Sequence, residues 1–292
     1  MFSGVYTALL TPFNNKNEID FHALDKLLEL QLMSGVDGIV PCGTTGESVT
    51  LTIEEYKSII NFCVKKIQRK IKILAGTGSN CTEHTIQLTQ FAEEAGCDGA
   101  LVVAPYYNKP TQTGLYLHFK KIANSVKFPI VLYNIAGRTS INIEPATIQK
   151  ICKTCQNVIG VKEASGSLKQ MGNIKSLIQE LEVISGDDIL TLPLLAIGGV
   201  GVISVVSNIV PTEIVNLVHN FNKGNIKDAM KLHYKLLPLM EAMFIETNPI
   251  PVKTAAGLLH ICESYLRLPM CSMEQDNKKK LIQTLDSYGI LK

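Results

Sequence analysis

Lys162 closes an apolar run, Val158–Lys162 (VIGVK), and this position suggests amine chemistry. A lysine at the end of a buried run is expected to hold its ammonium group partly out of water. Desolvation disfavours the charged form, so some neutral amine is available near neutrality. A neutral amine can attack a ketone and form an imine. By position alone, an ordinary surface lysine at a strand end is the more common case.

Three neighbouring motifs strengthen the chemical interpretation. The stretch Gly43–Ser48 (GTTGES) has two glycines that let the backbone approach a ligand, and its hydroxyl and N–H groups suit a carboxylate. Tyr133 brings a phenol to the end of the run Ile130–Asn134, and Arg138 follows in the next loop. A guanidinium group can hold a carboxylate through two parallel hydrogen bonds. Taken alone, a G-T-T-G motif also occurs as a simple turn.

The chain that must position these residues alternates short apolar runs with longer amphipathic segments. Near-continuous Val, Ile and Leu are typical of parallel strands that are buried on both faces. The eight runs are Tyr6–Leu10, Gly38–Val40, Ile71–Ala75, Ala100–Val103, Ile130–Asn134, Val158–Lys162, Glu182–Ser185 and Gly201–Val205.

Helical patterns separate the runs. An apolar stripe begins at Phe21, Thr52-Ile-Glu-Glu fits a capping box, and Thr82 opens a helix that Gly96 stops. Further helices are predicted at 112–126, 145–154, 168–180, 189–197 and 211–223. Eight strand–helix units favour a (β/α)8 TIM barrel over a doubly wound sheet, since no G-x-G-x-x-G follows the first strand.

The alternation ends after Gly224. Residues 225–292 are predicted to be helical only, at 226–245, about 250–263 and 275–286. We therefore predict an α/β chain of two parts: a catalytic barrel over 1–224 and a small, all-helical C-terminal domain over 225–292. In such a barrel the active site is built at the carboxyl ends of the strands, where the motifs above occur.

Seven motifs, in order and over nearly the whole chain, resemble those of the dihydrodipicolinate (4-hydroxy-tetrahydrodipicolinate) synthase family, within the N-acetylneuraminate lyase superfamily of class I pyruvate aldolases. They are GTTGES, PYYN at 105–108, YNxxxR at 133–138, GVKEASG around Lys162, SGDD at 185–188, GVISV at 201–205 and NPIPVK at 248–253. The resemblance implies a lyase that condenses pyruvate with L-aspartate-4-semialdehyde in diaminopimelate and lysine biosynthesis. It also implies a homotetramer, a dimer of dimers.

The resemblance assigns roles residue by residue. Lys162 matches the lysine that forms the imine, and Tyr133 matches the acid/base tyrosine. Thr44 and Tyr107 match the partners that complete a hydroxyl relay with Tyr133; in the family, that second tyrosine comes from a neighbouring subunit. No cofactor or metal is implied, because the covalent imine on Lys162 polarises the substrate.

Four further residues match substrate-binding positions. Thr45 matches the residue that holds the pyruvate carboxylate, and Arg138 matches the arginine that receives the semialdehyde carboxylate. Gly186 and Ile203 match backbone contacts near the lysine. The NPIPVK stretch is distinctive of the family, but we assign it no catalytic role, because a rigid helix entry explains it.

The motifs leave two other enzymatic activities open. N-acetylneuraminate lyase and 2-keto-3-deoxy sugar acid aldolases share the lysine, the tyrosine and a similar loop. Arg138 and the SGDD stretch favour the synthase, because a small carboxylated aldehyde needs a cation where a sugar needs hydroxyl partners. A barrel that binds pyruvate as a sensor, without turnover, is the alternative from another class.

A regulatory site for lysine is also matched in part. Its matching positions are Ser48, Asn80 and Tyr106. Ile53, Tyr56 and His84 depart from the polar or charged residues typical of lysine-inhibited bacterial members, which carry a glutamate at the position of His84. An imidazole replaces a carboxylate poorly as a partner for an ammonium group. We therefore predict weak or absent inhibition by lysine.

Composition excludes several other classes. Lys plus Arg number 28 and Asp plus Glu 26, so the formal charge of +2 predicts neither nucleic acid nor an anionic membrane as partner. No window approaches the roughly 18 apolar residues of a membrane span. The six histidines are scattered, and Cys152 and Cys155 form only half a zinc motif, which we interpret as two cysteines of one helix. We expect a cytoplasmic protein with reduced thiols.

Overall fold

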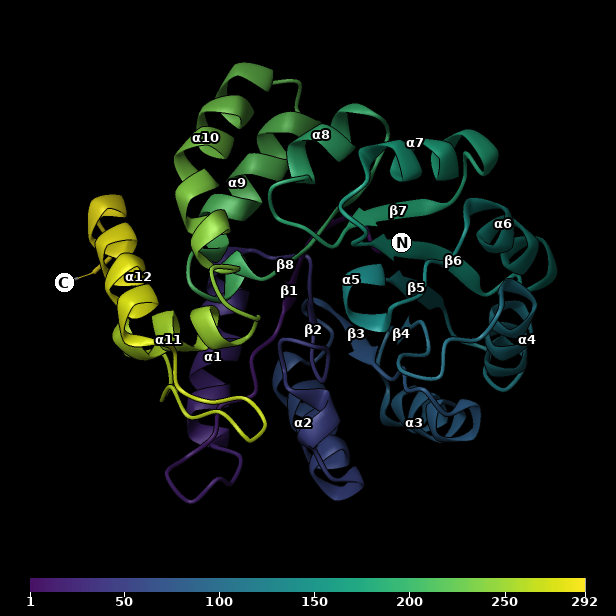
Figure 1. Ribbon diagram of the computed structural model, residues 1–292, viewed down its shortest axis with the longest axis horizontal. Coiled ribbons are helices and arrows are strands. Elements are labelled where there is room, and N and C mark those ends of the chain that lie inside the picture. Colours follow the sequence, from purple (N-terminus) through teal and green to yellow (C-terminus); the bar gives the residue numbers. More distant parts are fainter. Residues whose placement is uncertain (292) are drawn as a thin grey trace.

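Eight parallel strands pair in chain order and close into a barrel in the computed structural model, which describes residues 1–291 (Figure 1). Strand β8 pairs with β1, and this pairing completes the barrel. The predicted (β/α)8 fold is confirmed. The strands are β1 (Gly4–Ala8), β2 (Gly38–Val40), β3 (Lys72–Gly76), β4 (Gly99–Val103), β5 (Ile130–Asn134), β6 (Val158–Glu163), β7 (Glu182–Ser185) and β8 (Gly201–Ser204).

Each predicted apolar run contains or overlaps a strand, because every strand is covered on both faces, by the barrel interior and by helices. The first run differs most in its position. Strand β1 begins at Gly4, before the predicted start at Tyr6, since Gly4 and Val5 already pair with Gly201 and Val202 of β8.

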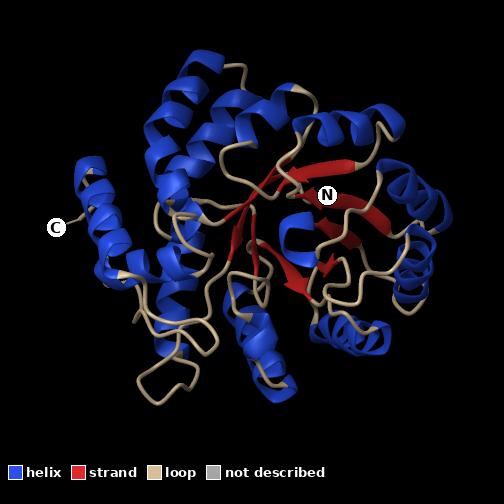
Figure 2. Ribbon diagram, viewed as in Figure 1, coloured by secondary structure: helices blue, strands red, loops and turns tan. Residues whose placement is uncertain are grey.

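A ring of helices surrounds the strands (Figure 2). The predicted capping box is present, because the Thr52 hydroxyl accepts from the Glu55 N–H and the Glu55 carboxylate accepts from the Thr52 N–H. The ring helices are α1 (Phe21–Ser34), α2 (Ile53–Ile67), α3 (Thr82–Ala95), α4 (Gln112–Ala123), α6 (Pro145–Thr154), α7 (Leu168–Leu177), α8 (Thr191–Ala196) and α9 (Pro211–Asn222).

Three short elements were not predicted, because they are too brief to show a helical period. They are α5 (Ala136–Thr139) and the 3-10 turns η1 (Ser48–Thr50) and η2 (Val206–Asn208). All three follow the carboxyl ends of strands, and α5 lies inside the ring of outer helices in Figure 1. They shape the end of the barrel at which the predicted site residues occur.

The chain after Gly224 forms α10 (Ile226–Ala242), α11 (Ile250–Leu258) and α12 (Gln275–Tyr288), beside α9 at one side of the barrel (Figure 1). The helix predicted at about 250–263 is shorter, and His260 adopts a left-handed φ of 56°. Leu236 and Leu281 belong to the same buried cluster as Leu24 of α1. The C-terminal helices therefore share one apolar core with the barrel. Over residues 1–291, no helix is long and apolar enough to cross a membrane.

Candidate active site

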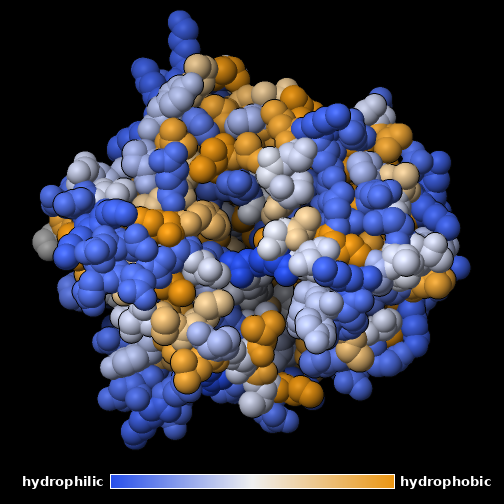
Figure 3. Space-filling view, viewed as in Figure 1, coloured by the Kyte–Doolittle hydropathy of each residue, from blue (hydrophilic) through white to orange (hydrophobic). Residues whose placement is uncertain are grey.

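A cavity of about 430 Å³ opens at the carboxyl ends of the strands. The space-filling view from the same side shows the surface hollowed at the centre, with hydrophilic residues beside the hollow (Figure 3). The structure thus brings most of the predicted residues together. Six of them line this inner cavity: Thr44, Thr45, Tyr133, Arg138, Lys162 and Gly186.

Lys162 and Tyr133 lie side by side within the barrel. They are direct register partners across β6 and β5, and alternation along each strand points both side chains to the same face. The Lys162 Nζ atom is 4.3 Å from the centre of the Tyr133 ring. Both residues are buried, at 6% and 5% exposure. An amine and a phenol are therefore available together inside the barrel, with little exposure to solvent.

The next register pair along β5 and β6 helps to hold Lys162 and Tyr133 in place. Asn134 pairs with Glu163, whose side chain is fully buried. One Glu163 oxygen accepts from Asn134 Nδ2 at 2.9 Å and from Gln170 Nε2 at 2.8 Å, and the other accepts from the Ser165 N–H. This carboxylate has good hydrogen-bond partners, so it can hold the end of β6 on which Lys162 is placed. The site prediction did not include it.

Gly186 is a glycine because Lys162 occupies the adjacent space. A Cβ atom there would lie 3.0 Å from Lys162 Cε and 2.5 Å from Ala164 Cβ. The two acids that follow Gly186, Asp187 and Asp188, accept hydrogen bonds from backbone N–H groups. Asp188 Oδ2 accepts from the Val205 and Val206 N–H groups, and burial raises the pKa of this carboxyl above its usual range. The SGDD stretch therefore fixes the chain after β8 and leaves Gly186 open toward the lysine.

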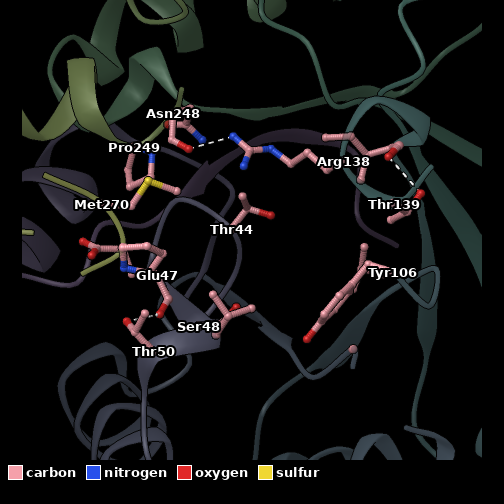
Figure 4. A pocket seen from close by; sticks show the side chains of 15 residues that line it. Thr44, Glu47, Ser48, Thr50, Tyr106, Arg138, Thr139, Asn248, Pro249 and Met270 are labelled. Carbon is pink, nitrogen blue, oxygen red and sulfur yellow. Dashed lines mark hydrogen bonds between the residues drawn. The ribbon is translucent and has the colours of Figure 1, made fainter. Parts of the chain in front are cut away.

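Asn248 connects the two substrate-binding candidates. Its Nδ2 donates to Thr45 Oγ1 at 3.0 Å. Its backbone carbonyl accepts from Arg138 Nη2 at 2.7 Å, the bond drawn between these two residues in Figure 4. Asn248 also lines the inner cavity, where its buried Oδ1 has no hydrogen-bond partner. The NPIPVK stretch was interpreted only as a helix entry, so sequence reasoning missed this residue. An asparagine directly before that helix entry was the available signal.

The inner cavity is cationic. Among the described residues that line it, Lys162 and Arg138 are basic and there is no Asp or Glu. Two cations without a facing carboxylate attract anionic ligands, and the low polarity of the surroundings strengthens the attraction. The lining therefore suits a substrate, or two substrates, that carry carboxylate groups.

An outer pocket of about 860 Å³ adjoins the inner cavity, and both are lined by Thr44, Ile135, Arg138 and Asn248. Figure 4 shows Arg138 and Asn248 on one side of this outer pocket, with Ser48 and Tyr106 further along it. The two spaces form one cleft that leads from the surface to Lys162. Within residues 1–291, no group of three His, Cys, Asp or Glu could hold a metal ion.

Three predicted residues lie outside the cleft. Tyr107 is 89% exposed and lines neither cavity, and its backbone is left-handed, with φ of 74°. Ile203 is buried in β8 without lining either cavity, and Asn80 lines neither. Of the predicted lysine site, the outer pocket thus includes Ser48 and Tyr106.

Comparison with known proteins identifies the family of the chain that forms this cleft. Residues 1–288 match the model of the dihydrodipicolinate synthetase family. The chain belongs to this family. It is 65% identical to the 4-hydroxy-tetrahydrodipicolinate synthase of Endomicrobium trichonymphae, over all of both chains.

Solved structures of the family have the same fold. The dihydrodipicolinate synthase of Aquifex aeolicus superposes with a TM-score of 0.97 at 45% identity, over 99% of each chain. The chloride-inhibited enzyme of Acinetobacter baumannii, solved in complex with pyruvate, gives a TM-score of 0.96 at 36% identity, over 99% of this chain and all of that one. Membership of the family supports the synthase and not the sugar acid aldolases among the activities that the motifs left open.

Proposed function

We propose that this chain condenses pyruvate with L-aspartate-4-semialdehyde through an imine on Lys162, as a lyase of diaminopimelate and lysine biosynthesis. The observation that carries the proposal is the pairing of Lys162 with Tyr133 inside a cationic cavity, in a chain whose full-length relatives are named 4-hydroxy-tetrahydrodipicolinate synthase.

Pyruvate enters first. The Lys162 amine attacks the ketone carbon, and the carbonyl oxygen leaves as water after it has been protonated. Tyr133 is the proton donor and acceptor for this step, and Thr44 completes the relay from the same cavity. Thr45 holds the pyruvate carboxylate, with its hydroxyl oriented by the bond from Asn248. No cofactor is required in this proposal, because the iminium group is itself the electron sink.

The semialdehyde reacts next. Loss of a methyl proton converts the imine to an enamine, whose carbon attacks the aldehyde carbon. The new C–C bond forms, the aldehyde oxygen takes up a proton and becomes a hydroxyl group, and the imine to Lys162 is restored. Arg138 binds the second carboxylate, and the free Oδ1 of Asn248 accepts from the neighbouring amino group. That amine then attacks the imine carbon, the bond to Lys162 breaks, and the lysine leaves as a free amine. Gly186, which lines the inner cavity, supplies a backbone contact near Lys162.

We further propose that the active form is a homotetramer, a dimer of dimers. Tyr107 is 89% exposed, so the phenol that the hydroxyl relay requires is available to a second copy of the chain rather than to its own cavity. Sedimentation of the purified protein tests this part. A monomer with full activity would refute it.

Two assays test the reaction. Borohydride reduction with pyruvate is expected to add the mass of a reduced pyruvyl group to Lys162, and a coupled assay should detect condensation with the semialdehyde. A barrel that only senses pyruvate would show no condensation. Cleavage of N-acetylneuraminate faster than condensation would instead indicate a sugar acid aldolase.

A further inference from the structure

Glu47 ends the loop that carries Thr44 and Thr45, and its carboxylate is almost fully buried. The side chain is 2% exposed, and the backbone is left-handed, with φ of 53°, a conformation that residues other than glycine rarely adopt. A buried carboxylate is costly unless a partner compensates its charge. Glu47 therefore needs a cation, and the chain supplies it from a distant segment.

Lys253 of α11 is that cation. Its side chain is completely buried, and its Nζ donates to Glu47 Oε1 at 2.5 Å and to the Thr11 carbonyl at 2.8 Å. The Nζ also lies 4.1 Å from the centre of the Phe13 ring. The same loop has a second attachment to this region, because Thr11 Oγ1 donates to the Gly46 carbonyl at 2.7 Å. One ammonium group thus joins the loop after β1, the loop after β2 and helix α11.

A second cation completes the cluster. The backbone N–H of Arg267 donates to Glu47 Oε2 at 3.0 Å, and the Arg267 guanidinium group donates two hydrogen bonds to the Glu55 carboxylate. The guanidinium carbon lies 4.3 Å from the centre of the Phe13 ring, which is also the ring that Lys253 Nζ approaches. The two cations and two carboxylates leave no net charge. The four charges neutralise one another, so the cluster is not suited to bind a charged ligand. Its role is therefore to fix the chain segments that it joins.

The cluster fixes the substrate loop, which we define as residues 43–47 after β2. Thr44 and Thr45 precede Glu47 by only a few residues, and Asn248, at the start of the segment that carries Lys253, donates to Thr45 Oγ1. The loop is thus fixed to residues 248–253 at two points, one on Thr45 and one on Glu47. A buried ion pair is often no more stabilising than apolar residues of similar size, so net stability alone does not account for it.

We propose that Lys253 and Glu47 are positioning residues for the reaction: their ion pair sets the loop geometry with which Thr44 and Thr45 receive pyruvate. Glu47 lines the outer pocket, but neither side chain of the pair lines the inner cavity around Lys162, so the pair acts through the two threonines. This inference rests on the proposed function, since it assigns the pyruvate carboxylate to Thr45.

A double-mutant cycle separates positioning from folding. Lys253→Met and Glu47→Gln each leave one buried charge without its partner, so each single variant should unfold at a lower temperature. The double variant removes both charges and should recover most of the unfolding temperature. We expect its KM for pyruvate to stay raised by about 10-fold, because small displacements of binding groups are costly to the reaction. The rate of borohydride trapping at low pyruvate should fall in parallel, with a smaller change in the KM for the semialdehyde.

Glu55→Gln is the matched control. It breaks the other ion pair of the cluster, with Arg267, and should lower the unfolding temperature without a selective change for pyruvate. A double variant that unfolds like the wild type and handles pyruvate like the wild type would refute the inference. If the double variant does not fold, Lys253→Arg keeps the charge but changes the shape of the cation. A folded Lys253→Arg protein with an unchanged KM for pyruvate would also refute it.

The trapping assay also separates this inference from the proposed function, because it needs no second substrate. A wild-type protein that traps no pyruvate would overturn the proposed function, and this inference with it. Equal trapping by the wild type and the folded double variant would overturn the positioning role alone.

Discussion

The Lys162 ammonium nitrogen lies 4.3 Å from the centre of the Tyr133 ring, because the two residues are register partners on adjacent parallel strands. Their closeness is therefore built into the hydrogen-bonded ladder of the barrel and does not depend on a mobile loop. Strand residues of a barrel hold their side chains with little freedom, which is what a proton transfer between fixed partners needs. Arg138, by contrast, lies in the one-turn helix α5 and the two threonines lie in the loop after β2, and all three depend on Asn248 or Lys253 for support.

Tyr133→Phe should leave the fold intact and slow catalysis by about 10²–10³-fold. The ring still fills its place beside Lys162, but the hydroxyl that moves protons is lost. Stopped-flow or steady-state assays of condensation measure the loss in kcat, and circular dichroism checks the fold. Activity within a factor of about two of the wild type would show that another group moves the proton.

Arg138→Ala should raise the KM for the semialdehyde by about 10–100-fold, because a bond between a guanidinium group and a carboxylate is lost. Trapping of pyruvate by borohydride should change little, since that step does not use the second carboxylate. Arg138→Lys keeps the positive charge but not the paired donors, so its KM for the semialdehyde should lie between those of the wild type and Arg138→Ala. If Arg138→Ala instead loses the trapping of pyruvate, Arg138 binds pyruvate and the prediction is wrong.

Asn248→Ala should raise the KM for both substrates, by about 10-fold each. The Thr45 hydroxyl loses its donor, and the amino group of the semialdehyde loses an acceptor. The bond from Arg138 is to the Asn248 backbone, so it persists in this variant. Full initial-velocity analysis with both substrates varied measures the pattern. A fall in the unfolding temperature with both constants unchanged would assign Asn248 a structural role only.

The ion pair between Arg267 and Glu55 should stabilise the protein in a pH-dependent way. The hydrogen bonds from Arg267 hold the pKa of the Glu55 carboxyl below its ordinary value of 4.5. An acid whose pKa is lower in the folded state adds stability above its unfolded value, and this stability is lost as the pH falls through the folded value. Glu55→Gln should therefore unfold about 1–3 °C below the wild type near neutral pH. Thermal unfolding as a function of pH should show that difference shrinking below 4.5. A constant difference would contradict the assignment.

Lysine should inhibit the wild type weakly, with half-inhibition above the sub-millimolar range. Tyr56 is buried, at 4% exposure, and Ile53 is apolar and 43% exposed, so neither offers a polar group to an effector. His84→Glu should lower the inhibition constant by about 10-fold, because a carboxylate attracts the effector ammonium. Initial rates with lysine varied measure both proteins. Sub-millimolar inhibition of the wild type would show that Ser48, Asn80 and Tyr106 suffice.

The elements were predictable because their causes are local. Apolar runs mark strands that are covered on both faces, and Thr52 with Glu55 forms the predicted cap from residues three positions apart. Boundaries were less predictable. The helix at 250–258 ends before its apolar pattern does, and α5 has only one turn, too few residues for a periodic signal.

The sequence by itself determined the barrel and its eight strands, and it predicted Lys162 as the reactive lysine, since strand ends and motifs can be recognised within a few consecutive residues. What only the tertiary structure decided was the support of the substrate loop. Asn248 meets Thr45 across 203 positions, and Lys253 meets Glu47 across 206. No local pattern encodes such pairs, because they form only when barrel closure brings the C-terminal segment to the loop after β2. The burial that follows is what makes an uncompensated charge at Glu47 costly and its partner necessary.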